Sequence, residues 1–138
     1  MHSRVFTWHA IQVGVYICGT PCFVIFISDP PTVHQHPQNV STDSGYPSTF
    51  TCSASGFPRP SITWYTQNGS EIHPLPENLN EITVNFTGAE GITSRLVVVI
   101  TVFADSGDYV CVASNPVGSS TSDPALLEVI GMLIIKCL

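Results

Sequence analysis

The seven residues DSGDYVC at positions 105–111 restrict the fold of this chain more than any other stretch. In an extended strand Tyr109 and Cys111 point to the same face, because side chains two residues apart share a face. A buried tyrosine hydroxyl needs a hydrogen-bond partner, and the backbone of a tight turn at residues 105–107 offers one. Gly107 permits such a turn, and the Asp105 carboxylate can bond the local backbone. The stretch therefore predicts a turn followed by a buried strand.

The region from residue 29 to residue 130 has the pattern of many short strands. Apolar and polar residues alternate in short runs, and clusters rich in Gly, Pro, Asn and Ser separate these runs. The predicted strands are an entry strand that contains His34 and His36, followed by STFTCSAS, SITWYTQ, EITVNF, SRLVVVITV, DYVCVAS and PALLEV, with turns at GFPRP, NG and NPVG. Seven or more short strands in about 100 residues predict a sandwich or a barrel.

Three motifs carry a resemblance to a known family. Cys52 lies in FTCSASG, Trp64 in ITWY and Cys111 in DSGDYVCVASNPVG. Together they resemble the immunoglobulin superfamily over residues 31–130, and within it the intermediate set found in cell-adhesion molecules and receptor ectodomains. The resemblance implies an all-β fold, a two-sheet antiparallel Greek-key sandwich. It also implies a disulfide between Cys52 and Cys111 that joins the sheets, with Trp64 packed against it and Asp105, Gly107 and Tyr109 completing the core motif.

One strand departs from the family pattern. Family members carry a small apolar residue four positions before the aspartate, where this chain has Thr101, and Val102 follows one step later. We expect a local bulge to absorb this offset.

The first 28 residues differ from the rest, and three interpretations of them stay open. Arg4 precedes an apolar run, which is typical of a secretory signal peptide cut near Gly19 or Cys22. Residues 5–27 are also long enough for an uncleaved signal anchor that tethers the chain to a membrane. The third interpretation is a wrongly placed start site. The first two place the chain from residue 29 onward outside the cytosol.

Glycosylation signals agree with an extracellular location. Asn39, Asn68 and Asn85 each begin an Asn-x-Ser/Thr triplet, whereas Asn115 begins NPV, which does not fit the pattern. We predict the first three as glycan acceptors, and paired cysteines are typical of the same oxidising compartment.

Cysteines outside the predicted pair give no metal-ligand pattern. Cys18 and Cys22 fall in the apolar segment and would leave with a cleaved signal. Cys137 is an odd thiol in a short apolar tail at residues 131–138, free or available for an intermolecular bond.

Composition and motifs exclude several classes of function. The chain has 4 Lys and Arg against 10 Asp and Glu, so it lacks the clustered cations that nucleic acid binding needs. We find no nucleophile elbow, zinc-protease motif or phosphate loop, and predict no enzyme activity and no cofactor. His34 and His36 would share a face of the first strand, but we interpret them as surface histidines and predict no metal site.

Strand parity suggests where a protein partner binds. If Trp64 and Cys111 face the core, then Tyr65, Val110 and Val112 face outward on neighbouring strands. Three apolar side chains on one sheet face form a candidate contact patch, although outward valines are also common in strands for their propensity alone.

The opposite sheet gives a contrast. If Ile82, Val84 and Phe86 face the core, Asn85 faces solvent, and a glycan there would cover outward Val97 and Val99. This favours the Tyr65 side for partners.

The expected function is that of a secreted or membrane-anchored recognition or adhesion module that binds a cell-surface or extracellular protein, either a second copy or a different protein. Two alternatives stay open. One is an ectodomain fragment of a larger cell-surface receptor of the kinase or phosphatase type. The other is an intracellular filament domain, which shares the fold.

Overall fold

The computed structural model describes residues 13–17, 23–74, 80–99 and 101–131. Cys18, Cys22 and Cys137 lie outside the described residues. Within the described part of the chain, no helix is long and apolar enough to cross a membrane. The assignment of residues 1–28 as a signal or anchor stays a prediction.

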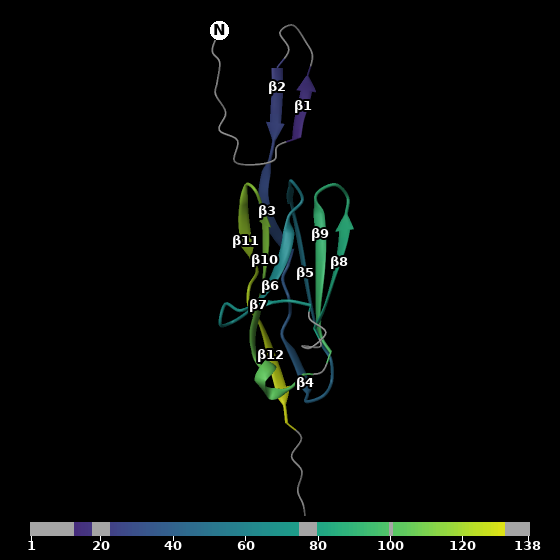
Figure 1. Ribbon diagram of the computed structural model, residues 1–138, viewed down its shortest axis with the longest axis vertical. Helices are drawn as coiled ribbons and strands as arrows, with labels where there is room; N and C mark the ends of the chain where they lie inside the picture. Colours follow the sequence, from purple (N-terminus) through teal and green to yellow (C-terminus); the bar gives the residue numbers. More distant parts are fainter. Residues whose placement is uncertain (1–12, 18–22, 75–79, 100, 132–138) are drawn as a thin grey trace, which may run out of the picture.

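Two β-sheets packed face to face form the body of the protein (Figure 1). The smaller sheet has the strand order β3 (Asp29–Gln35), β5 (Ser48–Phe57), β9 (Gly91–Val98) and β8 (Asn80–Thr87). The larger sheet has the order β4 (Val40–Asp43), β12 (Ala125–Ile130), β10 (Gly107–Asn115), β6 (Ser61–Thr66) and β7 (Glu71–Ile72), and β11 (Gly118–Thr121) also pairs with β10. A 3-10 turn, η1 (Phe103–Asp105), precedes β10. The predicted all-β sandwich is confirmed.

A separate hairpin precedes the sandwich. It consists of β1 (Val13–Ile17) and β2 (Phe23–Ile27), which pair antiparallel.

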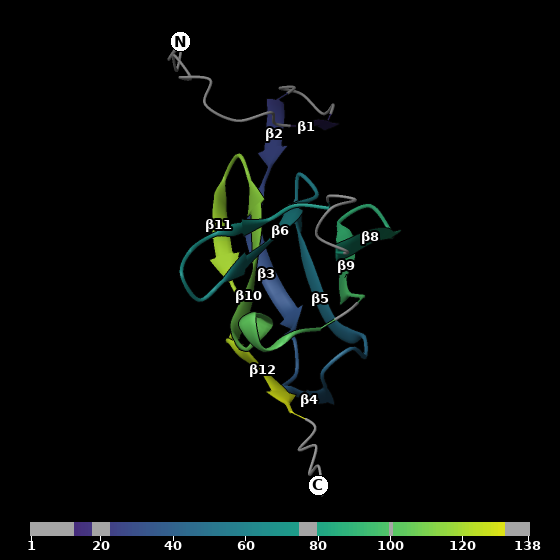
Figure 2. The ribbon, with the colours of Figure 1, turned by 60° about the horizontal axis from the view of Figure 1, so that its bottom comes forward.

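The N-terminal side of the sandwich contributes to both sheets. β3 pairs antiparallel with β5 in the smaller sheet, and after the buried Pro37 the chain continues as β4, which pairs parallel with β12 in the larger sheet. β4 and β12 lie side by side at the lower end in Figures 1 and 2. This placement leaves β8 and β7 as the strands at the other edges of the two sheets.

The core lies between the sheets and is built on period-two alternation. Every second residue is buried in β5, and in β10 from Tyr109 to Ala113, which puts Cys52 and Cys111 inside. Their disulfide joins the sheets, with Cα atoms 6.5 Å apart, so the predicted pairing is confirmed. The indole Nε1 of Trp64 donates a hydrogen bond to Ser94 Oγ at 2.9 Å, and Phe50 stacks on Tyr109 with ring centroids 4.9 Å apart.

The core ends before the β8 edge. The apolar side chains of β8 lie opposite buried residues of β9, on the core side of the sheet as expected, but not all of them are covered. Ile82 is half-buried, but Val84 and Phe86 are 44% and 64% exposed. β8 is an edge strand, and the larger sheet ends opposite in a two-residue strand, so too little chain faces these side chains to cover them. The guanidinium carbon of Arg59 lies 4.5 Å from the centroid of the Phe86 ring instead.

The bulge expected near Thr101 stays a prediction, because residue 100 lies outside the described residues. β5 and β9 pair without interruption from Ser48 with Val98 to Ser55 with Gly91. Thr101 is fully buried where the family pattern has an apolar residue, and Val102 is exposed. Thr101 Oγ1 donates to the carbonyl oxygen of Tyr46 at 2.6 Å, with the Asp43 carbonyl oxygen at 3.3 Å. A threonine fits this position because the neighbouring backbone accepts its hydroxyl proton.

Candidate functional site

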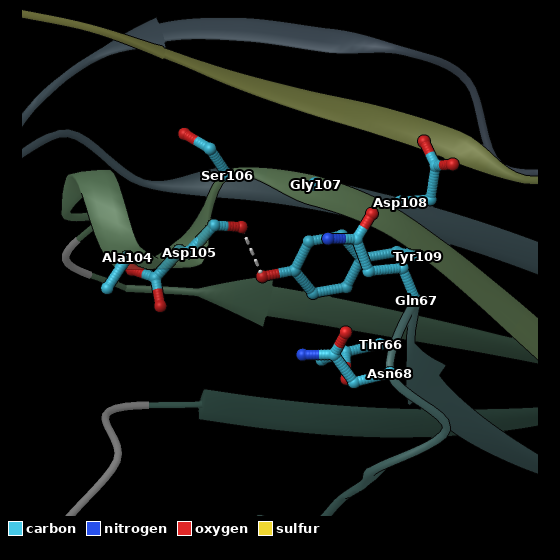
Figure 3. Close-up of a pocket in the computed structure, with 9 residues that line it drawn as sticks. All are labelled: Thr66, Gln67, Asn68, Ala104, Asp105, Ser106, Gly107, Asp108 and Tyr109. Carbon is cyan, nitrogen blue, oxygen red and sulfur yellow. Dashed lines mark hydrogen bonds between the residues drawn. The ribbon is translucent and has the colours of Figure 1, made fainter.

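The turn before β10 positions the Tyr109 side chain through the backbone. The Tyr109 hydroxyl donates to the carbonyl oxygen of Asp105 at 2.8 Å (Figure 3). The Asp105 carboxylate in turn accepts the Val102 amide proton at 2.8 Å, which closes the 3-10 turn. Burial, and after it the charge of Asp105, raises the pKa of Tyr109 to about 12. The phenol is therefore a structural donor and stays neutral at physiological pH.

Both the backbone conformation at position 107 and the neighbouring side chain require a glycine there. Its φ is +139°, a region that side chains rarely adopt, and an added Cβ would lie 3.2 Å from the Gln67 side chain. A small polar cavity of about 180 Å³ adjoins this turn (Figure 3). It is lined by Thr66, Gln67, Asn68 and residues 104–109.

Tyr65, Val110 and Val112 come together on the outward face of the larger sheet. Tyr65 lies directly opposite Val110 in the β6–β10 pairing, and Val112 lies two residues further along β10. All three are half-buried, since each packs against its neighbours on the sheet. An open hollow of about 510 Å³ is lined by these three side chains together with Thr66, Gln67, Gly69, Asp108 and Pro124.

Sequence reasoning missed part of this face. Leu126 lies opposite Asp108 in the β10–β12 pairing and is 46% exposed. The alternation in ALLEVI marks Leu126 and Glu128 as outward once Leu127 is taken as core. Asp108 is two residues from Val110 and belongs to the same face by the parity that identified Val110.

The three predicted glycan acceptors have exposed side chains in different places. Asn68 sits in the tight turn between β6 and β7, and Asn85 faces outward from β8 opposite Thr93. Asn39 precedes β4, and its Oδ1 accepts the Leu126 amide proton at 2.9 Å. A glycan attaches through the amide nitrogen, so this hydrogen bond is compatible with glycosylation. Glycosylation of all three stays a prediction.

The two histidines of the first strand have separate partners. His34 Nε2 contacts the Ser55 hydroxyl. His36 Nδ1 accepts the Asp123 amide proton at 2.9 Å, and it lies 3.7 Å from the Asp123 carboxylate. Within the described residues no group of three or more His, Cys, Asp or Glu is placed to hold a metal.

Comparisons with known proteins give one family. Its profile, described as immunoglobulin domain, matches residues 30–115. Roundabout homolog 2 of Homo sapiens is 33% identical over 100 residues, which is 72% of this chain and 7% of that protein. A peroxidasin homolog of Caenorhabditis briggsae is 36% identical over 129 residues, 94% of this chain and 9% of that protein. The basement membrane proteoglycan of Caenorhabditis elegans is 31% identical over 122 residues, 80% of this chain and 3% of that protein. The chain spans less than a tenth of the length of each of these relatives.

Solved structures with this fold include domains of titin. A chimeric titin Z1Z2 protein matches with a TM-score of 0.62 and 28% identity, covering 77% of this chain and 99% of that chain. An I-band fragment of titin matches with a TM-score of 0.61 and 30% identity, covering 74% and 33%. The family profile covers more than half of the sequence, and the sandwich carries the disulfide and the buried tryptophan and tyrosine that the resemblance implied. The chain therefore belongs to the immunoglobulin domain family.

Proposed function

We propose that this chain is a non-catalytic extracellular recognition or adhesion module that binds a protein partner through the outward face of β6 and β10. The hollow lined by Tyr65, Val110 and Val112 carries the proposal. Apolar side chains gathered on one exposed sheet face are typical of protein contact surfaces, because docking removes them from water.

Three observations support the extracellular part of the proposal. The Cys52–Cys111 disulfide is of a kind that persists in oxidising compartments. The asparagines of the three acceptor triplets are exposed. One relative is by name a basement membrane protein. On this proposal residues 1–28 act as a signal peptide or as a membrane anchor, and residues 131–138 form a short tail.

Binding assays on variants test the proposed face. The wild-type chain is first screened as a multivalent bait against an array of extracellular protein domains. Each hit is then measured with Tyr65→Glu, which puts a charge into the hollow and is expected to weaken binding at least tenfold. Tyr46→Glu is the matched control, because Tyr46 is 62% exposed at the turn before β5. Unchanged binding of Tyr65→Glu to every hit would rule out this face.

The alternatives concern where the domain works. The relatives are far longer than this chain, which favours the same module acting as one domain of a larger cell-surface receptor. The likeness to titin domains favours an intracellular filament domain.

Intact mass of the chain expressed in eukaryotic cells separates these locations. Mass is measured before and after glycan removal and thiol labelling. A secreted or surface-held product with sugar attached and protected Cys52 and Cys111 supports the proposal. A full-length, sugar-free chain with labelled thiols inside the cell contradicts it and favours the filament alternative.

A further inference from the structure

An apolar stripe runs across the outward face of the larger sheet. We define the apolar stripe as Tyr65, Val110, Val112 and Leu126. Tyr65 and Val110 are opposite each other, and Leu126 is opposite Asp108, the residue two before Val110. Side chains that are opposite or diagonal in an antiparallel pair lie within contact range on the same face. The stripe therefore crosses β6, β10 and β12.

Carboxylates lie on the same sheet face as the apolar stripe. Glu71 of β7 lies opposite Tyr65, Asp108 opposite Leu126, and Asp43 of β4 opposite Ile130, while Glu128 is two residues beyond Leu126. We call Asp43, Glu71, Asp108 and Glu128 the acidic rim. The six strands of this sheet contain no Lys or Arg. The rim thus gives the face a negative potential at neutral pH.

Among the described residues, one rim carboxylate has a basic side chain within ion-pair distance. His73 Nδ1 lies 3.6 Å from Glu71 Oε1, and both side chains are largely exposed. The other three rim carboxylates have no described Lys, Arg or His within ion-pair distance.

We infer that the apolar stripe docks a protein different from this chain, whose contact surface has an apolar centre and lysine or arginine side chains around it. The inference rests on the proposed function and adds the chemistry of the partner. Apolar burial supplies the attraction at the centre, and complementary charges at the edge orient the partner and speed its association.

A second copy of this chain does not present the basic contact surface that the inferred partner needs. A two-fold contact through this face places the same patch on both sides, so acidic rims would face each other. Like charges brought together across an interface oppose association. The described arginines belong to other surfaces: Arg95 is on β9 in the smaller sheet, and Arg59 contacts the Gly88 carbonyl oxygen and the Phe86 ring. The described part of the chain therefore offers no basic surface that complements its own acidic rim.

Three cyclic β-hairpin peptides serve as probes of this face. The first carries leucines at the centre of one side and lysines at its ends. The second replaces the lysines with glutamates, and the third replaces the leucines with serines. Binding to the isotope-labelled chain is followed by amide chemical shifts and by titration in 50 mM and 500 mM salt. We expect only the leucine–lysine peptide to shift the amides of the apolar stripe, with affinity falling about tenfold at the higher salt.

Variants that neutralise carboxylates of the acidic rim test whether the rim causes the preference for the lysine-bearing peptide. The pair Glu71→Gln and Asp108→Asn is expected to weaken binding of the leucine–lysine peptide by about two- to fivefold for each charge. The control pair is Glu81→Gln and Glu90→Gln, two exposed carboxylates of the smaller sheet and its β8–β9 turn. Amide spectra of all variants report whether they fold like the wild type.

The outcomes separate this inference from the proposed function. If the leucine–glutamate peptide binds the stripe as tightly as the leucine–lysine peptide, the face is a docking surface and the inferred partner charge is wrong. Equal binding of the serine–lysine peptide also overturns the inference, because the stripe then contributes nothing. If no peptide shifts the stripe amides, both the inference and the proposed face are overturned.

Discussion

At the scale of single residues, Tyr109 shows how one hydroxyl ties a strand to the turn before it. Its ring is buried against Phe50 and its hydroxyl is bonded to Asp105. The raised pKa has a consequence for stability. The unfolded chain loses the phenol proton near pH 10, whereas the folded chain holds it until about pH 12. The contribution of this group to the free energy of unfolding is therefore complete below pH 10 and is lost as pH rises toward 12.

Tyr109→Phe tests this link. We expect the free energy of unfolding to fall by about 1 kcal/mol at pH 7, because the Asp105 carbonyl oxygen loses a donor. We also expect a smaller decline in stability between pH 10 and pH 12 than in the wild type. Urea denaturation at a series of pH values measures both, with Tyr46→Phe as the exposed control. An unchanged alkaline decline in Tyr109→Phe would show that another group causes it.

The role of Thr101 also depends on one hydrogen bond, which its hydroxyl group donates. Thr101→Val keeps the volume and removes the donor to the Tyr46 carbonyl oxygen, so we expect a loss of about 1–2 kcal/mol. Thr101→Ser keeps the donor and is the comparison, although it removes a buried methyl group. Thermal unfolding of both variants gives the difference. A valine variant as stable as the wild type would mean that the family's apolar residue suits this chain equally well.

At the scale of elements, local alternation predicted which strands have a buried face but not how far the core reaches. STFTCSAS and DYVCVAS became β5 and β10 with the predicted residues inside. EITVNF has the same alternation, yet Val84 and Phe86 are exposed. The difference is that β8 is an edge strand, and strand order is set by pairings between segments far apart in the sequence. For the same reason, the alternation of side chains within single strands was enough to predict Tyr65, Val110 and Val112. Placing Glu71 and Leu126 beside them required the register of β7 and β12.

Alanine substitutions of two phenylalanines test where the core ends. Phe50→Ala is expected to cost about 3–5 kcal/mol, because the ring is fully buried. Phe86→Ala is expected to cost less than about 1 kcal/mol, since only its contact with Arg59 and limited packing are lost. Chemical denaturation of the two variants gives the comparison. Similar losses would contradict an exposed β8 edge.

At the scale of the whole molecule, the disulfide holds together two sheets whose strands are distant in sequence. Cys52 and Cys111 are separated by 59 positions, and closing a loop of that length stabilises a fold by about 4 kcal/mol in the chain-entropy account. Small domains are stable by only about 5–15 kcal/mol. Losing about 4 kcal/mol would therefore remove about a quarter or more of such a margin.

Replacing both cysteines by alanine tests this dependence. We expect the free energy of unfolding to fall by about 4 kcal/mol. Denaturant unfolding of the wild type and of the double variant at 25 °C measures this difference. Reduction of the wild-type chain is the control, since it breaks the same bond without changing the sequence. If the double variant and the reduced wild type both keep the wild-type midpoint, the sandwich does not need the bond.

The parallel pairing of β4 with β12 also determines how the molecule responds to pulling. Tension along the chain reaches β4 from its N-terminal side and β12 from its C-terminal side. Because the strands run parallel, the two pulls act in opposite directions along their shared row of hydrogen bonds, from Val40 with Leu127 to Asp43 with Ile130. These bonds are loaded together in shear instead of opening one at a time. A module pulled at both of its ends would thus keep its sheet faces intact under load.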